Sequence, residues 1–251
     1  MIPDLMDQMR RAFAIAKKDV RIYYLNGPVV IFGILAPAFL FLAFMIGRDL
    51  PVDFLIAGLL GMTVFFTSTS ITPVIAPTET QTRNLERLAA APVSITTILF
   101  GDMIASVFFG IAISLVPIFL GVAFGVAIAH PLILAVGIVL AAFCFSALGL
   151  VFSSTPTSMT STVMMISMLT KFPLVFVSGV FIPIQEMPSW GRALASLSPL
   201  TYITDLCRYC IEGTCANYYP VPLDICALAV FLVIFMVTAV KLHERSLPMR
   251  L

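Results

Sequence analysis

Charge is what this sequence has least of. Only 11% of its 251 residues are charged, whereas a soluble domain carries about 25%. Hydrophobic residues make up 60% of the chain. This composition excludes an ordinary soluble domain and indicates an integral membrane protein. The formal net charge of +1 gives no reason to expect a nucleic-acid partner.

Motifs for catalysis are also missing. A P-loop needs G-x-x-x-x-G-K-[ST], in which the lysine reaches the phosphates and the hydroxyl holds Mg²⁺. The lysines at positions 17, 18, 171 and 241 are followed by Lys, Asp, Phe and Leu, so none fits. The 2 histidines form no H-E-x-x-H, and G-x-S-x-G does not occur. We therefore expect no enzymatic activity, no metal and no bound cofactor in this chain.

Long apolar runs dominate what is present. A run of about 20 uncharged apolar residues is the length that crosses the hydrocarbon core. Such runs cover approximately residues 28–46, 54–76, 98–125, 132–152, 162–182 and 223–240. They predict an all-α integral membrane protein with six transmembrane helices. Pro117 lies within the third run, where we expect a kink or a tilt.

The distribution of lysine and arginine predicts the orientation, because short cytoplasmic loops hold the excess of positive charge. With the N-terminus inside, most of the basic residues fall on the cytoplasmic side, and both termini face the cytoplasm. These residues are Arg10, Arg11, Lys17, Lys18, Arg21, Arg83, Arg87, Lys241, Arg245 and Arg250.

Residues 1–27 predict an amphipathic helix at the inner membrane surface. At helical spacing, one apolar stripe is formed by Leu5, Met9, Phe13, Ala16, Val20 and Tyr24. A separate basic arc contains Arg10, Arg11, Lys17, Lys18 and Arg21. This arc either meets anionic lipid alone or also docks a soluble partner.

Residues 183–213, between the fifth and sixth runs, are too polar for a lipid-exposed span. We expect two short helices that re-enter the outer leaflet under cover of protein. Ser198 suits an N-cap, Pro199 the first helical position and Asp205 an early turn. The aromatic residues Trp190, Tyr202, Tyr218 and Tyr219 suit either an outer interface belt or contact with substrate.

The run from 178 to 208, SGVFIPIQEMPSWGRALASLSPLTYITDLCR, resembles the signature of the ABC-2 type transporter permeases. The matching positions are Ser178, Gly179, Pro183, Pro188, Trp190, Pro199, Leu200, Thr201, Tyr202, Asp205 and Arg208. The segment 78–97 is similar to the cytoplasmic coupling loop of that family. Its matching positions are Leu85, Glu86, Leu88, Pro92, Val93 and Ser94.

The resemblance implies a complex. Two permease copies, identical or related, would assemble with two soluble ATPase subunits that hold ATP and Mg²⁺. The coupling loop would sit in a groove of the ATPase, with charged side chains in cross-subunit ion pairs and leucines as an apolar anchor. These residues are Glu79, Arg83, Glu86 and Arg87 for the ion pairs, and Leu85 and Leu88 for the anchor. The alternative is an ordinary solvated loop.

Two features depart from the family pattern. Residues 78–84 lack the usual dense charged run, and Asp102 stands where a basic residue is common at the start of the third span. The expected function remains a plasma-membrane exporter of a hydrophobic or amphiphilic substrate such as a drug, a lipid or a lipid-linked glycan. The alternative is an ATP-independent secondary carrier or a membrane scaffold.

Lys171 and the cysteines each leave two interpretations open. Lys171 lies within the fifth run, where a cation either contacts an anionic substrate group or is paired inside the bundle or snorkels. Cys207 and Cys210 form a C-x-x-C near Cys215. They are either buried thiols or part of an incidental outer disulfide, because no second pair of metal ligands is present.

Overall fold

The computed structural model describes residues 5–24, 35, 37–39, 42, 43, 46, 51–84, 93–211 and 217–246. Most of the predicted first span at 28–46 lies outside these residues. The same holds for four of the predicted coupling residues, Leu85, Glu86, Arg87 and Leu88.

The described chain is helical, and its only extended pairing is an isolated bridge between Ile128 and Ile211. The helices are α1 (Leu5–Asp19), which continues into the wider turn η1 (Val20–Tyr24), α3 (Val52–Ser68), α4 (Thr72–Gln81), α6 (Ile95–Ala123), α7 (Pro131–Ser153), α8 (Thr160–Val177), η2 (Ile184–Glu186), α9 (Ser189–Ala195), α10 (Pro199–Cys210) and α11 (Val221–Ser246). The predicted all-helical membrane fold is confirmed at this level.

Among the described residues, 5 helical segments are long and apolar enough to span a membrane: α3 with α4, then α6, α7, α8 and α11. Helices α6 and α7 fall close to the predicted ranges. Helix α8 ends at Val177, earlier than expected, because Gly179 adopts a φ of 78° that turns the chain away. Helix α11 runs on to Ser246, beyond the apolar run.

The second predicted span is not one continuous helix. Its chain leaves helical geometry between Ser68 and Thr72, so α3 and α4 are separate helices. Pro73 follows the break and has no N–H to continue the hydrogen-bond ladder. Helix α4 then extends to Gln81, past the predicted end at 76.

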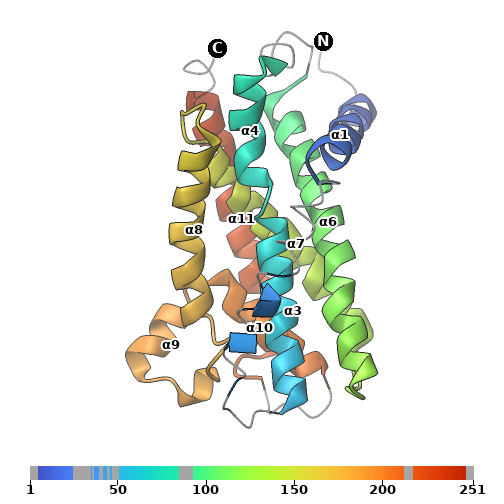
Figure 1. Cartoon of the computed structure of the whole chain (residues 1–251), viewed down its shortest axis with the longest axis vertical. Helices are drawn as coiled ribbons and strands as arrows, with labels where there is room; N and C mark the ends of the chain where they lie inside the picture. The colour runs from blue at the N-terminus through green and yellow to red at the C-terminus, as the bar shows by residue number, and fades with distance from the viewer. Residues whose placement is uncertain are drawn as a thin grey trace.

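Helix α3 lies at the centre of the bundle, and its residues from Leu55 to Ser68 are buried. It packs against α6, α7 and α10, and α7 also packs against α11. Figure 1 shows α1 beside α6 at one end of the bundle and α9 and α10 at the opposite end. Helix α8 stands at one side, where it packs mainly against α4. The last turns of α11 lie at the same end as α1 (Figure 1).

Candidate functional site

Four ionisable side chains meet where α1, α4 and α6 come together, and we call Lys18, Asp19, Glu79 and Asp102 the inner charged cluster. Lys18 Nζ donates a hydrogen bond to Glu79 Oε1 and lies 3.1 Å from Asp19 Oδ1. The side chains of Asp19, Glu79 and Asp102 are 0%, 2% and 3% exposed. The cluster therefore joins the predicted interfacial helix to the end of the second span and the start of the third.

A close approach of α1 to α6 brings the cluster together. Ala12, Ile15 and Ala16 are buried on the face of α1 that meets α6. The approach requires glycine at 101, because a Cβ there would lie 2.8 Å from Ile15 Cβ and 2.9 Å from the carbonyl oxygen of Ala12. Small residues at this contact thus determine how deeply the neighbouring Asp102 and Asp19 are buried.

Tyr24 holds the other end of the N-terminal segment. Its side chain is fully buried, and its ring packs against Phe109 with 5.1 Å between centroids. The Tyr24 hydroxyl lies 3.3 Å from Thr72 Oγ1 at the start of α4. Residues 5–24 are therefore attached to the bundle along most of their length.

Only part of the apolar stripe predicted for this segment faces the bundle in the structure. Ala16 and Tyr24 face the bundle, whereas Met9 and Phe13 are exposed. Their exposure arises because the contact with α6 uses Ala12, whose small side chain permits the close approach. Exposed apolar side chains beside basic residues are typical of a helix at a membrane surface. The location of α1 at the membrane surface stays a prediction.

Electrostatics within the cluster are set by burial and by the excess of carboxyl groups. Burial alone would lower the pKa of Lys18, but Asp19 and Glu79 raise it above its usual value. Burial raises the pKa of Asp19, and the neighbouring Lys18, which favours the carboxylate, only partly offsets this. Lys18 is thus held as a cation by its two acidic neighbours.

The predicted coupling residues separate into two groups. Glu79 lies inside α4 and is paired with Lys18 of the same chain, where the sequence predicted a partner on another subunit. Arg83 is exposed beyond the end of α4, with a φ of 54°. The other four lie outside the described residues. Gln81 Nε2 donates to the carbonyl oxygen of Ser158, which ties the end of α4 to the segment before α8.

Lys171 reaches from α8 to the break between α3 and α4. Its side chain is 2% exposed, and Nζ donates to the carbonyl oxygen of Thr69 over 2.6 Å. In a continuous helix this oxygen would accept from residue 73, which is a proline. Ser106 Oγ donates in the same way to the carbonyl oxygen of Ser68, over 2.7 Å. The geometry favours the paired interpretation of Lys171.

The charged residues of the predicted signature hold the opposite end together. Asp205 accepts the backbone N–H groups of Tyr218 and Tyr219, at 2.9 Å and 2.8 Å. Arg208 Nη2 donates to the carbonyl oxygen of Gly179 over 2.5 Å, and the guanidinium lies 4.3 Å from the centre of the Phe54 ring. Asp205 sits in the middle of α10, not in the early turn that the sequence suggested.

Other signature residues make local contacts in α9, α10 and their connections. Thr201 and Tyr202 donate to the carbonyl oxygens of Ala195 and Ser196, and Ser178 donates to that of Val175. Ser198 occupies the predicted N-cap position but donates to Leu174 in place of capping α10. Pro183 and Pro188 directly precede η2 and α9, and Trp190 is exposed.

The described cysteines are free, and Cys207 and Cys210 are buried. Burial raises the pKa of both thiols. Cys215 lies outside the described residues. No group of three His, Cys, Asp or Glu side chains able to hold a metal is found in the part of the chain that the structure describes.

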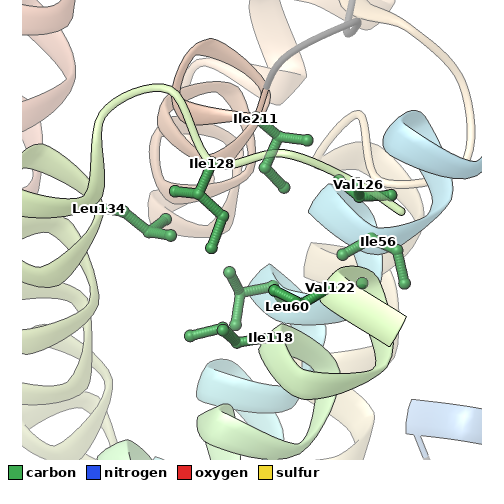
Figure 2. Close-up of a pocket in the computed structure, with 9 residues that line it drawn as sticks. Ile56, Leu60, Ile118, Val122, Val126, Ile128, Leu134 and Ile211 are labelled. Atoms are coloured by element: carbon green, nitrogen blue, oxygen red, sulfur yellow. The ribbon is translucent and has the colours of Figure 1, made fainter. Parts of the chain in front are cut away.

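A small pocket near the N-terminal end of α3 and the C-terminal end of α6 has an entirely apolar lining (Figure 2). It is lined by Ile56, Leu60, Ile118, Gly121, Val122, Val126, Ile128, Leu134 and Ile211. With no polar side chain to orient a ligand, this pocket offers no chemistry. Polar features of the described bundle lie instead at the inner charged cluster, at the α3–α4 break and around Asp205, Arg208 and Asp224.

Comparison with known proteins gives two matches. A family described as "ABC-2 type transporter" matches residues 10–211. The chain is also 29% identical, over 102 residues, to the daunorubicin resistance ABC transporter permease protein DrrB1 of Streptomyces coeruleorubidus. That alignment covers 41% of this chain and 34% of the relative.

Proposed function

Because this chain belongs to the ABC-2 type transporter family, and is thus a membrane subunit of an ABC transporter, we propose that it exports a hydrophobic or amphiphilic substrate. The energy comes from ATP hydrolysed on a separate subunit. The lack of a P-loop in this sequence supports that division of labour. The name of DrrB1, a daunorubicin resistance permease, supports a drug-like substrate and outward transport.

The observation that carries the proposal is the attachment of the start of the predicted coupling loop, residues 78–97, to the rest of the bundle; we call this loop the coupling segment. Its first residues form the end of helix α4, and Glu79 there is paired with Lys18. Gln81 bonds to the segment before α8. A displacement of the coupling segment by the ATPase would therefore move α1, α4 and α8 together, which is how a local contact changes a transmembrane cavity.

We assign the ATPase contact to Arg83, Glu86 and Arg87, with Leu85 and Leu88 as the apolar anchor. Glu79 transmits the movement and does not touch the ATPase. This division follows from exposure: Arg83 is exposed beyond α4, whereas the Glu79 carboxylate is buried against Lys18.

A second permease copy completes the transport unit. Within the described part of the chain, helix α8 packs mainly against α4, and it exposes large apolar side chains along its length. These include Met165, Leu169, Phe172 and Phe176. We assign this face to the surface that lines the shared cavity or meets the second copy, since an exporter of this family is built from two permeases.

The first test is to reverse two charges of the coupling segment, Glu86→Lys with Arg87→Glu, in the tagged chain purified from native membranes in mild detergent. We expect the unaltered chain to copurify with a soluble subunit that bears G-x-x-x-x-G-K-[ST] and hydrolyses ATP. The double reversal should lose that subunit while the chain still inserts, because the ion pairs of the contact become repulsive.

The matched control is a double reversal at the opposite end of the bundle, Glu186→Lys with Arg192→Glu. It introduces the same charges but should leave the copurified ATPase in place. If the coupling reversal retains the ATPase and full transport, the assigned contact is wrong. If no ATPase accompanies the unaltered chain, the secondary-carrier or scaffold alternative replaces the exporter.

A further inference from the structure

The inner charged cluster contains more acidic groups than basic ones. Lys18 is its one ammonium group, and Asp19, Glu79 and Asp102 are its carboxyl groups. All three carboxyl groups are buried. If every group were ionised, two negative charges would remain without a counter-charge in the part of the chain that the structure describes. Such charges are expensive in a site removed from water.

The geometry shows where the imbalance lies. Glu79 accepts the hydrogen bond of Lys18. Asp19 of α1 and Asp102 of α6 are electrostatic neighbours across the contact between these helices, next to the close approach of Ile15 to Gly101. Both oxygens of Asp19 and Oδ1 of Asp102 nevertheless accept no hydrogen bond from any described donor. The Lys18 ammonium lies near Asp19 Oδ1 in an ion pair, but its hydrogen bond goes to Glu79.

Two facing carboxylates have no hydrogen atom between them, so their contact is repulsive when both are ionised. One proton converts the contact into an O–H···O⁻ hydrogen bond, which is short and strong in a buried site. Like-charged carboxyl pairs in other proteins resolve the same conflict by holding a proton. We propose that Asp19 and Asp102 share one proton at neutral pH, which makes the contact between α1 and α6 a proton-binding site.

The other titratable groups around the pair do not supply the missing positive charge. Tyr23 and Tyr24 of η1 are neutral phenols, and burial raises the pKa of Tyr23 to about 12. Glu79 of α4 adds negative charge, and Lys18 is shared between Glu79 and Asp19. With one proton bound, the charge left on the cluster falls from two negative units to one.

The bound proton makes the attachment of α1 depend on pH. When α1 detaches, the two carboxyl groups enter water, where an aspartic acid releases its proton near pH 3.9. Attached α1 therefore holds more protons than detached α1 over the range above this value. Rising pH favours detachment, and the equilibrium constant for detachment increases up to about tenfold per pH unit until the attached form also loses its proton.

Two measurements test the site, and neither depends on the proposed transport function. Infrared spectroscopy of the full chain in detergent at neutral pH should show the carbonyl stretch of a protonated carboxylic acid. The intensity of this band should fall in Asp102→Asn and in Asp19→Asn, and any intensity that remains in both belongs to carboxyl groups outside the cluster, such as the buried Asp224. The matched control is Asp7→Asn, since Asp7 lies on the exposed side of the same helix. It should leave the band unchanged.

The second measurement is the thermal midpoint as a function of pH, between about pH 6 and about pH 9. The unaltered chain and Asp7→Asn should lose stability as the pH rises. Asp102→Asn carries an amide that donates to Asp19 without a titrating proton, so its midpoint should change less with pH.

The absence of a protonated carboxyl band in the unaltered chain would overturn the proposal, even if the variants failed to fold. So would equal pH dependence in the unaltered chain and Asp102→Asn. A midpoint that depends on sodium or potassium concentration and not on pH would replace the proton with a metal cation and equally overturn it.

Discussion

Replacing Lys171 with methionine removes one hydrogen bond and leaves the rest of the site nearly unchanged in volume. The Nζ atom donates to the carbonyl oxygen of Thr69 over 2.6 Å, inside the bundle. Methionine fills similar space but cannot donate. The oxygen then has no donor among the residues that the structure describes, because Pro73 lacks the N–H that a continuous helix would provide.

The expected loss is the balance of a cost and a relief. Leaving the buried carbonyl of Thr69 without its donor costs about 1–3 kcal/mol. Removing the buried amine returns part of this cost, because its desolvation no longer opposes folding. We expect a net loss of about 1–2 kcal/mol. For a chain of this length each kcal/mol lowers Tm by about 2–4 °C, so Tm should fall by about 2–8 °C.

The assay is thermal unfolding of the purified chain in detergent, with Lys241→Met as the matched control. Lys241 is exposed on α11, and its replacement should not change Tm detectably. In a Pro73→Ala background the residue at 73 regains its N–H, so the effect of Lys171→Met should become smaller.

An unchanged Tm in Lys171→Met would refute the role of Lys171 as the donor to the Thr69 carbonyl. An equal fall in Tm in the unaltered background and in the Pro73→Ala background would refute the part assigned to Pro73. If Tm were unchanged but transport were lost, contact with an anionic substrate group would become the better explanation of Lys171.

Two further predictions concern the opposite ends of the bundle. Gly101→Ala should lower the free energy of unfolding by about 1–3 kcal/mol in thermal unfolding, because its Cβ would meet the backbone of α1. The control Gly191→Ala should change the free energy of unfolding by no more than about 0.5 kcal/mol, because the atoms nearest to its Cβ are 3.4 Å away or more. A normal Tm for Gly101→Ala would show that α1 does not need this approach. Asp205→Asn should cost about 1–3 kcal/mol and speed hydrogen exchange at the amides of Tyr218 and Tyr219, because the amide offers only one acceptor oxygen for two N–H donors. Unchanged exchange at both amides would contradict that role.

Much of the architecture could be predicted from the sequence, because hydrophobic length and helical period are local properties. The ranges of α6 and α7 followed from apolar runs, and the start of α10 from Pro199. The signature from Ser178 to Arg208 identified the family that the comparison confirmed. The break in the second span was missed, although Pro73 and Pro77 were a visible local signal for it.

The candidate site was less predictable. Glu79 was singled out as a charged residue next to a span, but its pairing with Lys18 crosses 61 positions of the sequence. Lys171 was recognised as unusual, but its acceptor at Thr69 lies 102 positions away. Asp102 was noted only as a departure from the family pattern, and nothing in its local sequence indicated that it would face Asp19.

The sequence by itself determined that the chain is a membrane protein without an ATPase motif, because composition, apolar length and the order of residues in a motif carry that information directly. Tertiary structure alone decided which charges face one another and which are buried. Those properties depend on how closely α1 approaches α6 and on where α8 meets the α3–α4 break. The same lysine or aspartate is a solvated surface charge or a buried partner according to packing between segments far apart in the chain.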